Sequence, residues 1–193
     1  MLDKKDARER VLAAAERLFA QKGYTAVTLR DIAAEIGIRH TSLYHHAPGG
    51  KEQLFIEVTE RNFQHHREGL THAIETTAPD VRAKLCAAAD WLLSQPPMDM
   101  LRMVYSDMPA IDPVHAERLS QVAYASVLLP IEATLREAQQ RGEINHSDLG
   151  LIAGGVLGMI ESLHAVPEHV LRQSRPAMAY ALIDTLLNGL RPR

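Results

Sequence analysis

Residues 28–46, TLRDIAAEIGIRHTSLYHH, decide the fold, because they form two short amphipathic segments joined at a glycine. The hydroxyl of Thr28 suits the free N–H groups of a first helical turn, and Asp31 follows three residues later, as in a capping box. Gly37 adopts a positive φ without strain and is expected to end the first helix. Ile32 and Leu43 are expected to face a common core. The stretch therefore predicts a helix-turn-helix.

Hydrogen-bonding side chains are concentrated in the second segment. Such donors suit phosphate oxygens and base edges, with the second helix in the major groove and the first crossing the DNA backbone. An ordinary helical hairpin with a polar surface is the alternative that this stretch alone leaves open. The predicted DNA contacts are Thr28, Arg39, His40, Thr41, Ser42, Tyr44, His45 and Lys51.

The flanking sequence favours the DNA-binding interpretation. Residues 7–24, ARERVLAAAERLFAQKGY, predict a helix that ends at Lys22 and Gly23, and KEQLF at 51–55 begins another helix. Through LFAQKGY (18–24), DIAAEIG (31–37), SLYHH (42–46) and KEQLF, roughly the first 57 residues resemble the TetR family of transcriptional regulators. The resemblance implies a dimeric, ligand-responsive repressor.

Three features depart from the family pattern. Arg39 stands where the family usually has a small capping residue, and Ala47 stands where it has an aromatic one. The linker APGG, residues 47–50, is one residue longer than the common form. The expected fold is unaffected, whereas the pitch of the recognition helix and the operator sequence stay open.

Charge is distributed unevenly along the chain. Residues 1–51 carry a net charge of +3, whereas residues 52–193 carry −6. A local basic surface is what attracts phosphates, so the acidic total does not exclude DNA binding. Lys4, Lys5, Arg8 and Arg10 are candidates for an arm along the DNA backbone, and the alternative is a solvated helix start.

Other features predict a cytoplasmic protein without a membrane span. Cys86 is the single cysteine, which excludes an intramolecular disulfide framework. The chain does not open with a charged segment followed by an apolar one, as a signal peptide does. Its longest apolar run, residues 149–160, is shorter than the about 20 residues that a transmembrane helix needs.

From residue 51 onward, apolar residues recur at helical spacing, with prolines and glycines between the periodic segments. Pro130 is expected to kink the helix that contains it, because proline lacks the backbone N–H. The sequence predicts an all-α protein of about nine helices. We expect a helix-turn-helix DNA-binding domain at 1–50 and a helical ligand-binding and dimerisation domain at 51–193. The helices expected in the second domain span 51–78, 80–95, a short part of 96–113, 114–141, 147–165 and 176–190.

The last two predicted helices favour a homodimer. Gly150, Gly154 and Gly158 recur every four residues, which lets another helix approach closely, and the remaining positions of this helix are apolar nearly all round. Two copies pairing as a four-helix bundle explain these apolar surfaces better than a monomer does. We therefore predict a homodimer through residues 147–190, and the family resemblance implies the same. A dimer is expected to bind a palindromic operator in double-stranded DNA.

No pattern points to catalysis or metal binding. The sequence lacks GxSxG, a glycine-rich phosphate loop and marked carboxylate pairs. Its ten histidines do not converge with Cys86 at zinc-ligand spacing. We therefore predict no enzyme activity, no catalytic residues, no cofactor and no metal.

A pocket for a small apolar ligand is the more plausible use of the second domain. Methionine and aromatic side chains give an adaptable apolar lining, and a histidine adds a polar contact. The alternative is that most of these are core residues. A helical small-molecule-binding or catalytic protein that no longer reads DNA is the competing function. The candidate ligand contacts are Trp91, Met103, Tyr105, Met108, Tyr124, Met159 and His164.

Overall fold

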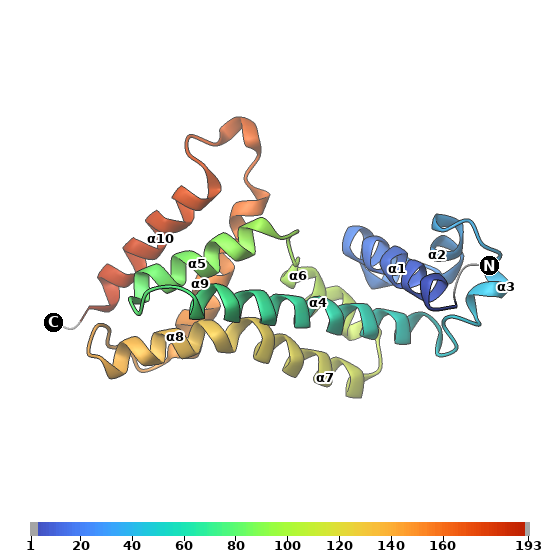
Figure 1. Cartoon of the computed structure of the whole chain (residues 1–193), viewed down its shortest axis with the longest axis horizontal. Coiled ribbons are helices and arrows are strands. Elements are labelled where there is room, and N and C mark those ends of the chain that lie inside the picture. The colour runs from blue at the N-terminus through green and yellow to red at the C-terminus, as the bar shows by residue number, and fades with distance from the viewer. Residues whose placement is uncertain (1–3, 192–193) are drawn as a thin grey trace. The chain divides into compact units, whose positions relative to one another are not determined.

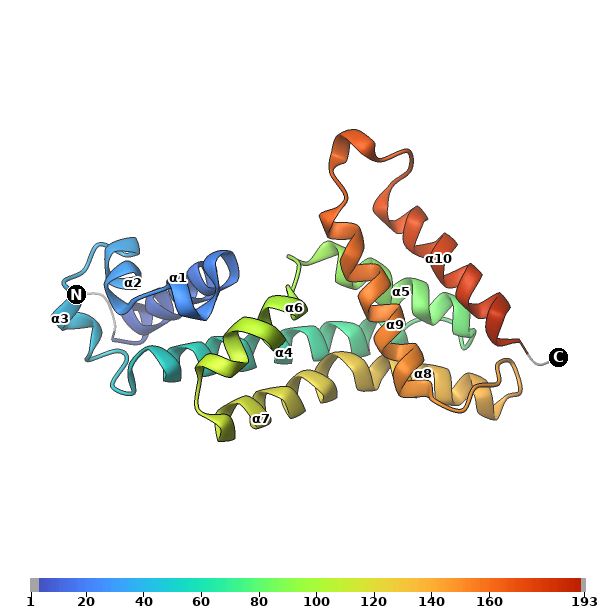
Figure 2. The ribbon, with the colours of Figure 1, turned by 180° about the vertical axis from the view of Figure 1, so that it is seen from behind.

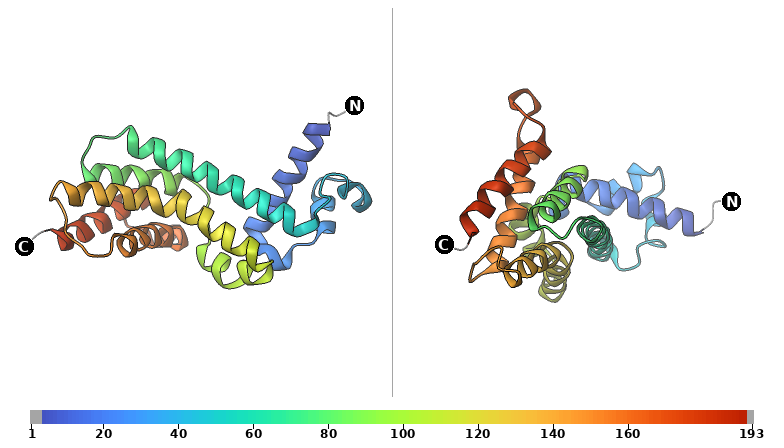
Figure 3. Two further views of the ribbon diagram at one scale, coloured as in Figure 1. Left: turned by 90° about the horizontal axis from the view of Figure 1, so that it is seen from below. Right: turned by 60° about the vertical axis from the view of Figure 1, so that its left-hand side comes forward.

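The computed structural model describes residues 4–191, apart from the side chains of Lys4 and Lys5, and every regular element in this range is helical (Figure 1). Helices α7 and α8 carry separate numbers because a π-helical turn, η3, lies between them. The ribbon from Pro113 to Gln140 is nevertheless unbroken (Figure 3). With α7 and α8 counted as one helix, the described residues form nine α-helices. This confirms the predicted all-α fold class.

The α-helices are α1 (Lys4–Ala26), α2 (Leu29–Glu35), α3 (His40–Leu43), α4 (Gly50–Glu75), α5 (Val81–Ser94), α6 (Met100–Arg102), α7 (Pro113–Ala123), α8 (Leu129–Gln140), α9 (Leu149–Ser162) and α10 (Arg175–Leu190). Two π-helical turns, η1 (Met103–Asp107) and η3 (Tyr124–Leu128), follow α6 and α7. Short 3-10 turns are η2 (Met108–Ala110), η4 (Leu163–Ala165) and η5 (Glu168–Val170).

The distortion expected at Pro130 takes the form of the π-turn η3, directly before the proline. Pro130 has no N–H for the carbonyl of Ser126, so the regular helical hydrogen bond cannot form there. The N–H of Leu129 instead donates to the carbonyl of Tyr124, five residues back. The sequence thus identified the position of the irregularity, and the backbone widens over one turn.

Packing divides the chain into two compact units. Unit 1 contains residues up to Asn62 together with Asp99–Val122, and unit 2 contains Phe63–Met98 and Ala123 onward. Residues 51–62 and 99–122 thus pack with the N-terminal helices, although the domain boundary predicted from the sequence assigned them to the second domain. The predicted division at residue 50 concerns function and stays a prediction.

Unit 1 has its own apolar core. Ile32 and Leu43 are fully buried, as expected from the helix-turn-helix pattern. The ring of Phe55 lies 5.3 Å from that of Phe19, edge to face, and 4.9 Å from that of Tyr24. These aromatic contacts join α1 to the start of α4. The helix-turn-helix therefore belongs to a packed apolar core.

Unit 2 is a bundle in which α10 packs against α5, and α9 packs against α8 (Figure 2). Phe63, Leu85, Ile131, Ile160 and Ile183 are fully buried in it. Over residues 4–191, the helices are all too short or too polar to cross a bilayer.

Candidate DNA-binding site

Helix α2 begins with the capping box that its sequence predicts. The N–H of Asp31 donates to the Thr28 hydroxyl (3.2 Å), while the Asp31 carboxylate accepts from the Thr28 N–H (2.8 Å) and hydroxyl (2.6 Å). The hydrogen bonds from Thr28 lower the pKa of Asp31. The Thr28 hydroxyl is therefore occupied in fixing the start of α2.

The turn between α2 and α3 depends on Gly37, whose φ is +70°. This left-handed conformation lets the N–H of Ile38 donate to the carbonyl of Ala33 at 3.0 Å. Ile38 then packs against the core of unit 1, as predicted. The turn therefore fixes the direction in which α3 leaves.

Helix α3 is a single turn. Arg39 occupies its N-cap without a side-chain cap, and Pro48 disfavours helical backbone at Ala47. Tyr44–His46 consequently lie in a turn beyond the helix. Leu43 is fully buried, so α3 is held by one side chain facing the core.

A hollow of about 420 Å³ lies beside α3 in unit 1. It brings together four of the predicted DNA contacts and adds Arg30, which the sequence analysis did not single out. Tyr44 is 50% exposed, and its ring lies 5.1 Å from that of His40. The complete lining consists of Val27, Thr28, Leu29, Arg30, His40, Tyr44 and Lys51.

Lys51 also has contacts within the protein. Its Nζ donates to the carbonyl of Tyr24 at 3.0 Å and lies 3.9 Å from the centre of the Tyr24 ring. These contacts hold the ammonium group at the edge of the hollow. A positive charge held in the same hollow as Tyr44 suits a phosphate group.

The remaining predicted DNA contacts lie on and around α3. Arg39, Thr41 and His45 are exposed, and Ser42 is half-buried. The turn from Arg39 to His45 therefore presents a guanidinium, a hydroxyl and an imidazole to solvent. Side chains of these kinds read base edges and bind phosphates.

Two arginines proposed for an N-terminal arm instead make bonds within the protein. Arg8 donates to the carbonyl of His46 and forms an ion pair with Glu57 at 2.5 Å. Arg10 donates to the carbonyl of Ile36 at 3.0 Å. Both connect α1 to the backbone on either side of α3 and so help to position the motif. The side chains of Lys4 and Lys5 lie outside the described residues.

The end of α1 is held by two residues that the sequence analysis missed. Gly23 breaks the helix with a φ of +78°, and the N–H of Tyr24 donates to Asp107 Oδ1 at 2.8 Å. Arg102 donates to the carbonyl of Ala20 at 2.9 Å, and its Nε lies 3.5 Å from Asp107 Oδ2. A Cβ on Gly23 would lie 3.0 Å from Asp107 Oδ1. Gly23 thus provides both the turn and the close approach.

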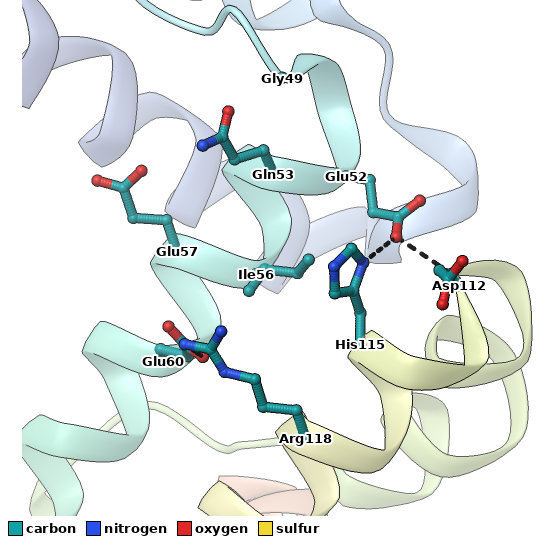
Figure 4. Close-up of a pocket in the computed structure, with 9 residues that line it drawn as sticks. All are labelled: Gly49, Glu52, Gln53, Ile56, Glu57, Glu60, Asp112, His115 and Arg118. Atoms are coloured by element: carbon teal, nitrogen blue, oxygen red, sulfur yellow. Dashed lines mark hydrogen bonds and ion pairs between the residues drawn. The ribbon is translucent and has the colours of Figure 1, made fainter.

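A second groove of unit 1, about 800 Å³ in volume, lies between α4 and the start of α7 (Figure 4). Glu52 Oε1 accepts from the N–H of Asp112 at 3.1 Å and lies 2.7 Å from His115 Nδ1. Arg118 forms an ion pair with Glu60 at 2.7 Å. These contacts link α4 to α7, and the excess of carboxylates makes this groove unsuitable for DNA.

The predicted ligand contacts are divided between the two units. In unit 1, Met108 packs against the apolar core, and Tyr105 is 79% exposed. Met103 and Tyr105 both lie in the π-turn η1. In unit 2, Tyr124 lies in the π-turn η3 and donates to Glu132 Oε2 at 2.6 Å. Trp91, Met159 and His164 are half-buried there.

The described residues contain no group of three or more His, Cys, Asp or Glu side chains arranged to hold a metal ion. The site in unit 1 is instead a surface of hydroxyl, imidazole, ammonium and guanidinium groups around a short helix. Such a surface is suited to binding an extended anion.

Comparison with known proteins agrees with this geometry. A family model described as "Bacterial regulatory proteins, tetR family" matches residues 11–58, which include the helix-turn-helix. The HTH-type transcriptional regulator LmrA of Bacillus subtilis is 43% identical over 70 residues. That match covers 36% of this chain and 37% of LmrA.

Solved structures extend the likeness along the chain. A bacterial regulatory protein of the tetR family from Rhodococcus RHA1 is 19% identical, with a TM-score of 0.76 and coverage of 97% and 98% of the two chains. AibR, solved with isovaleryl coenzyme A and operator DNA, is 18% identical, with a TM-score of 0.75 and coverage of 93% and 97%. These likenesses show the fold. Together with the family model and the matching site, they show that the chain is a member of the TetR family of transcriptional regulators.

Proposed function

We propose that this protein is a dimeric, ligand-responsive repressor that binds a palindromic operator through α2 and α3. The observation that carries the proposal is the hollow beside α3, where Arg30, His40, Tyr44 and Lys51 meet. A phosphate in this hollow would face the ammonium group of Lys51, the guanidinium of Arg30 and the side chain of Tyr44. Exposed Arg39 and Thr41 would then lie at the base edges of the major groove.

The two sides of this interface have different roles. Tyr44 and Lys51, at the hollow, are proposed to bind the DNA backbone, which positions the protein without reading sequence. Arg39, at the exposed start of α3, is proposed to read a base, because a guanidinium matches the O6 and N7 acceptors of guanine. In a two-fold dimer the centres of the half-sites are expected at least about 34 to 36 Å apart.

We expect Arg39→Ala to weaken the best-bound DNA by about 1 to 3 kcal/mol and to relax base preference at one position of each half-site. Tyr44→Phe should weaken all duplexes by a similar factor, since it removes a hydroxyl contact to phosphate. The measurement is selection from random-sequence duplexes, followed by fluorescence anisotropy with the recovered DNA.

Gln121→Ala, at an exposed position of α7 away from the hollow, is the control and should bind as the unchanged protein does. A uniform loss of affinity in Arg39→Ala would assign Arg39 to the DNA backbone. Failure of the unchanged protein to enrich any sequence would instead favour a helical protein that binds small molecules without reading DNA.

The exposed faces of α9 and α10 support the dimer. Leu151, Gly155 and Gly158 lie at intervals of four and three residues along one exposed stripe of α9, and Leu151 is 66% exposed. A Cβ at Gly155 or Gly158 would meet no atom within 4 Å. An apolar stripe of this kind is commonly covered by another helix. We therefore propose that a second copy covers it.

Buried polar atoms in unit 2 support a ligand site there. Within the described residues, Trp91 Nε1, His66 Nδ1 and His164 Nε2 are buried without a hydrogen-bond partner. Buried polar groups in folded proteins usually have such partners. We propose that a small, largely apolar ligand binds beside Trp91, Met159 and His164 and forms hydrogen bonds with some of these unpaired atoms. The ligand present in the AibR complex is consistent with effector binding by this fold.

A ligand of this kind is expected to weaken operator binding about 5- to 150-fold, the range of a coupling of about 1 to 3 kcal/mol. Trp91 is the only tryptophan, so its emission reports on the site during titration with a panel of small apolar acids and amines. Calorimetry with and without operator then measures the coupling.

The substitution His164→Ala should lower the affinity of the protein for the ligand. His169→Ala changes an exposed histidine of η5 and is the control. Equal ligand affinities with and without operator would exclude this form of regulation.

A further inference from the structure

Three of the ten histidines lie within seven residues, on α3 of the DNA-binding site and in the turn that follows it. His40 and His46 are half-buried and His45 is exposed, all on or directly after α3. Within the part of the chain that the structure describes, no imidazole nitrogen of the three is hydrogen-bonded to another side chain. Histidine is the side chain whose charge ordinarily changes between pH 5 and 8.

We propose that the protein binds its operator in a pH-dependent manner, more tightly as the pH falls from 8 to 6, because DNA phosphates hold His40, His45 and His46 in their charged forms. The inference rests on the proposed DNA-binding function and concerns its regulation.

The groups around His40 favour proton uptake on binding. His40 shares the hollow with Arg30 of α2 and Lys51 of α4, beside the Tyr44 ring. A phosphate bound in the hollow would place an opposite charge beside the His40 imidazole, and an opposite charge favours the protonated form. Binding and protonation therefore reinforce each other.

Nearby carboxylates are already paired with other groups. Glu57 of α4 forms an ion pair with Arg8 of α1, which also donates to the carbonyl of His46. On α2, Asp31 is bonded to Thr28, and Glu35 pairs with Arg17 at 3.1 Å. The partners of these acids are therefore groups other than the three imidazoles.

The other charged side chains of α1, and Arg39 before α3, also have few carboxylates free to pair with the three imidazoles. On α1, Arg10 donates to the carbonyl of Ile36, and Glu9 pairs with Arg61 at 2.9 Å, while Asp6 is exposed. The exposed guanidinium of Arg39 precedes His40. Asp6 and the exposed Glu16 of α1 have no ion pair among the described residues, whereas DNA brings a row of phosphates.

Histidines elsewhere are not expected to produce the same response. Burial lowers the pKa of His66 to about 4, so its imidazole stays neutral between pH 6 and 8. His115, in the second groove of unit 1, lies beside Glu52 and away from the hollow lining. Substitution of His115 or of the exposed His72 therefore provides a control for general effects of pH.

The test is fluorescence anisotropy at pH 6, 7 and 8 and constant ionic strength, with a duplex recovered by selection from random sequence. We expect at least about tenfold tighter binding at pH 6 than at pH 8, since each proton taken up steepens the dependence of affinity on pH. The sign follows because bound phosphate favours the charged imidazole, so the gain is lost as the pH rises. The salt dependence should also be steeper at pH 6, by about 0.9 in log–log slope per added phosphate contact.

Substitutions separate charge from structure. With all three residues changed to Gln, affinity should be low and nearly independent of pH. His45→Lys fixes one charge at an exposed position and should bind more tightly than the unchanged protein at pH 8, with a smaller pH effect. His72→Gln and His115→Gln should retain the full pH effect. Circular dichroism at each pH confirms that every variant is folded.

Two negative outcomes have different meanings. If the unchanged protein binds DNA with the same affinity at pH 6 and pH 8, or if the triple variant keeps the full pH effect, the inference is wrong and the proposed function stands. If no duplex is recovered at either pH, the proposed function itself fails.

Discussion

Asp107→Ala is expected to lower the free energy of unfolding by about 2 to 4 kcal/mol, because it leaves buried polar groups without partners. The Asp107 side chain is 5% exposed, and it binds the Tyr24 N–H and faces Arg102. Without the carboxylate, the Tyr24 N–H loses its partner, and the Arg102 guanidinium loses its ion pair with Asp107 while it keeps its contacts with the Ala20 carbonyl and Asp99. Because α1 carries Arg8 and Arg10, which contact the backbone around α3, operator affinity should fall as well.

Urea unfolding followed by circular dichroism measures the change in stability. Asp107→Asn keeps an acceptor for the Tyr24 N–H but loses the charge, so its effect should be smaller. Glu117→Ala removes an exposed carboxylate on α7 and should stay within about 0.5 kcal/mol of the unchanged protein. A stability of Asp107→Ala equal to that of Glu117→Ala would show that this carboxylate does not hold α1.

Gly158→Glu is expected to convert the proposed dimer to monomers, with dimer affinity reduced at least about 100-fold. Gly158 lies on the exposed stripe of α9, and a Cβ added there would point into open space. The fold of the protomer should therefore be retained. In a two-fold interface each substitution appears twice, and like charges facing each other cost several kcal/mol.

Sedimentation velocity over a range of concentrations measures the association. Gln121→Glu creates the same charge at an exposed position of α7 and should leave the dimer intact. Operator affinity should fall in parallel with dimerisation, since the monomer presents one α3 to one half-site. A Gly158→Glu protein that sediments as the unchanged dimer would place the interface elsewhere.

A hollow of about 460 Å³ beside α10 lies near the expected interface. Met178, Ala181, Leu182 and Thr185 of α10 line one side of it, and Val170, which is 55% exposed, lies on the other. This surface extends the apolar area available to a second copy beyond the stripe of α9. We therefore expect both terminal helices to contribute to the interface, as the sequence predicts.

The linker after α3 shows how the structure changes the meaning of a sequence feature. The two glycines of APGG suggest a compliant joint, but their conformations differ. Gly50 has a φ of +74°, which an alanine adopts only with strain, whereas a Cβ on Gly49 would overlap the side chain of Gln53. Each glycine therefore has a specific structural requirement, and replacement of Gly50 would strain the joint as well as stiffen it.

Local chemistry in the sequence determined the helix-turn-helix and most helix positions. The capping box of Thr28 and Asp31, the positive φ of Gly37 and the burial of Leu43 depend on neighbours within a few residues. Such interactions can be inferred from residue type and spacing alone. The same is true of the irregularity before Pro130, whose cause is the absence of a single N–H.

Only the tertiary structure brought Asp107 and Arg102 to the end of α1, placed residues 99–122 in unit 1 and assembled the hollow around His40, Lys51 and Arg30. These groups are separated by 10 to more than 80 residues along the chain. No periodicity of one helix encodes such contacts, because they arise when apolar faces of different helices pack and carry their polar neighbours with them. Spacing within the chain thus fixed the local elements, and packing between helices fixed which polar groups meet.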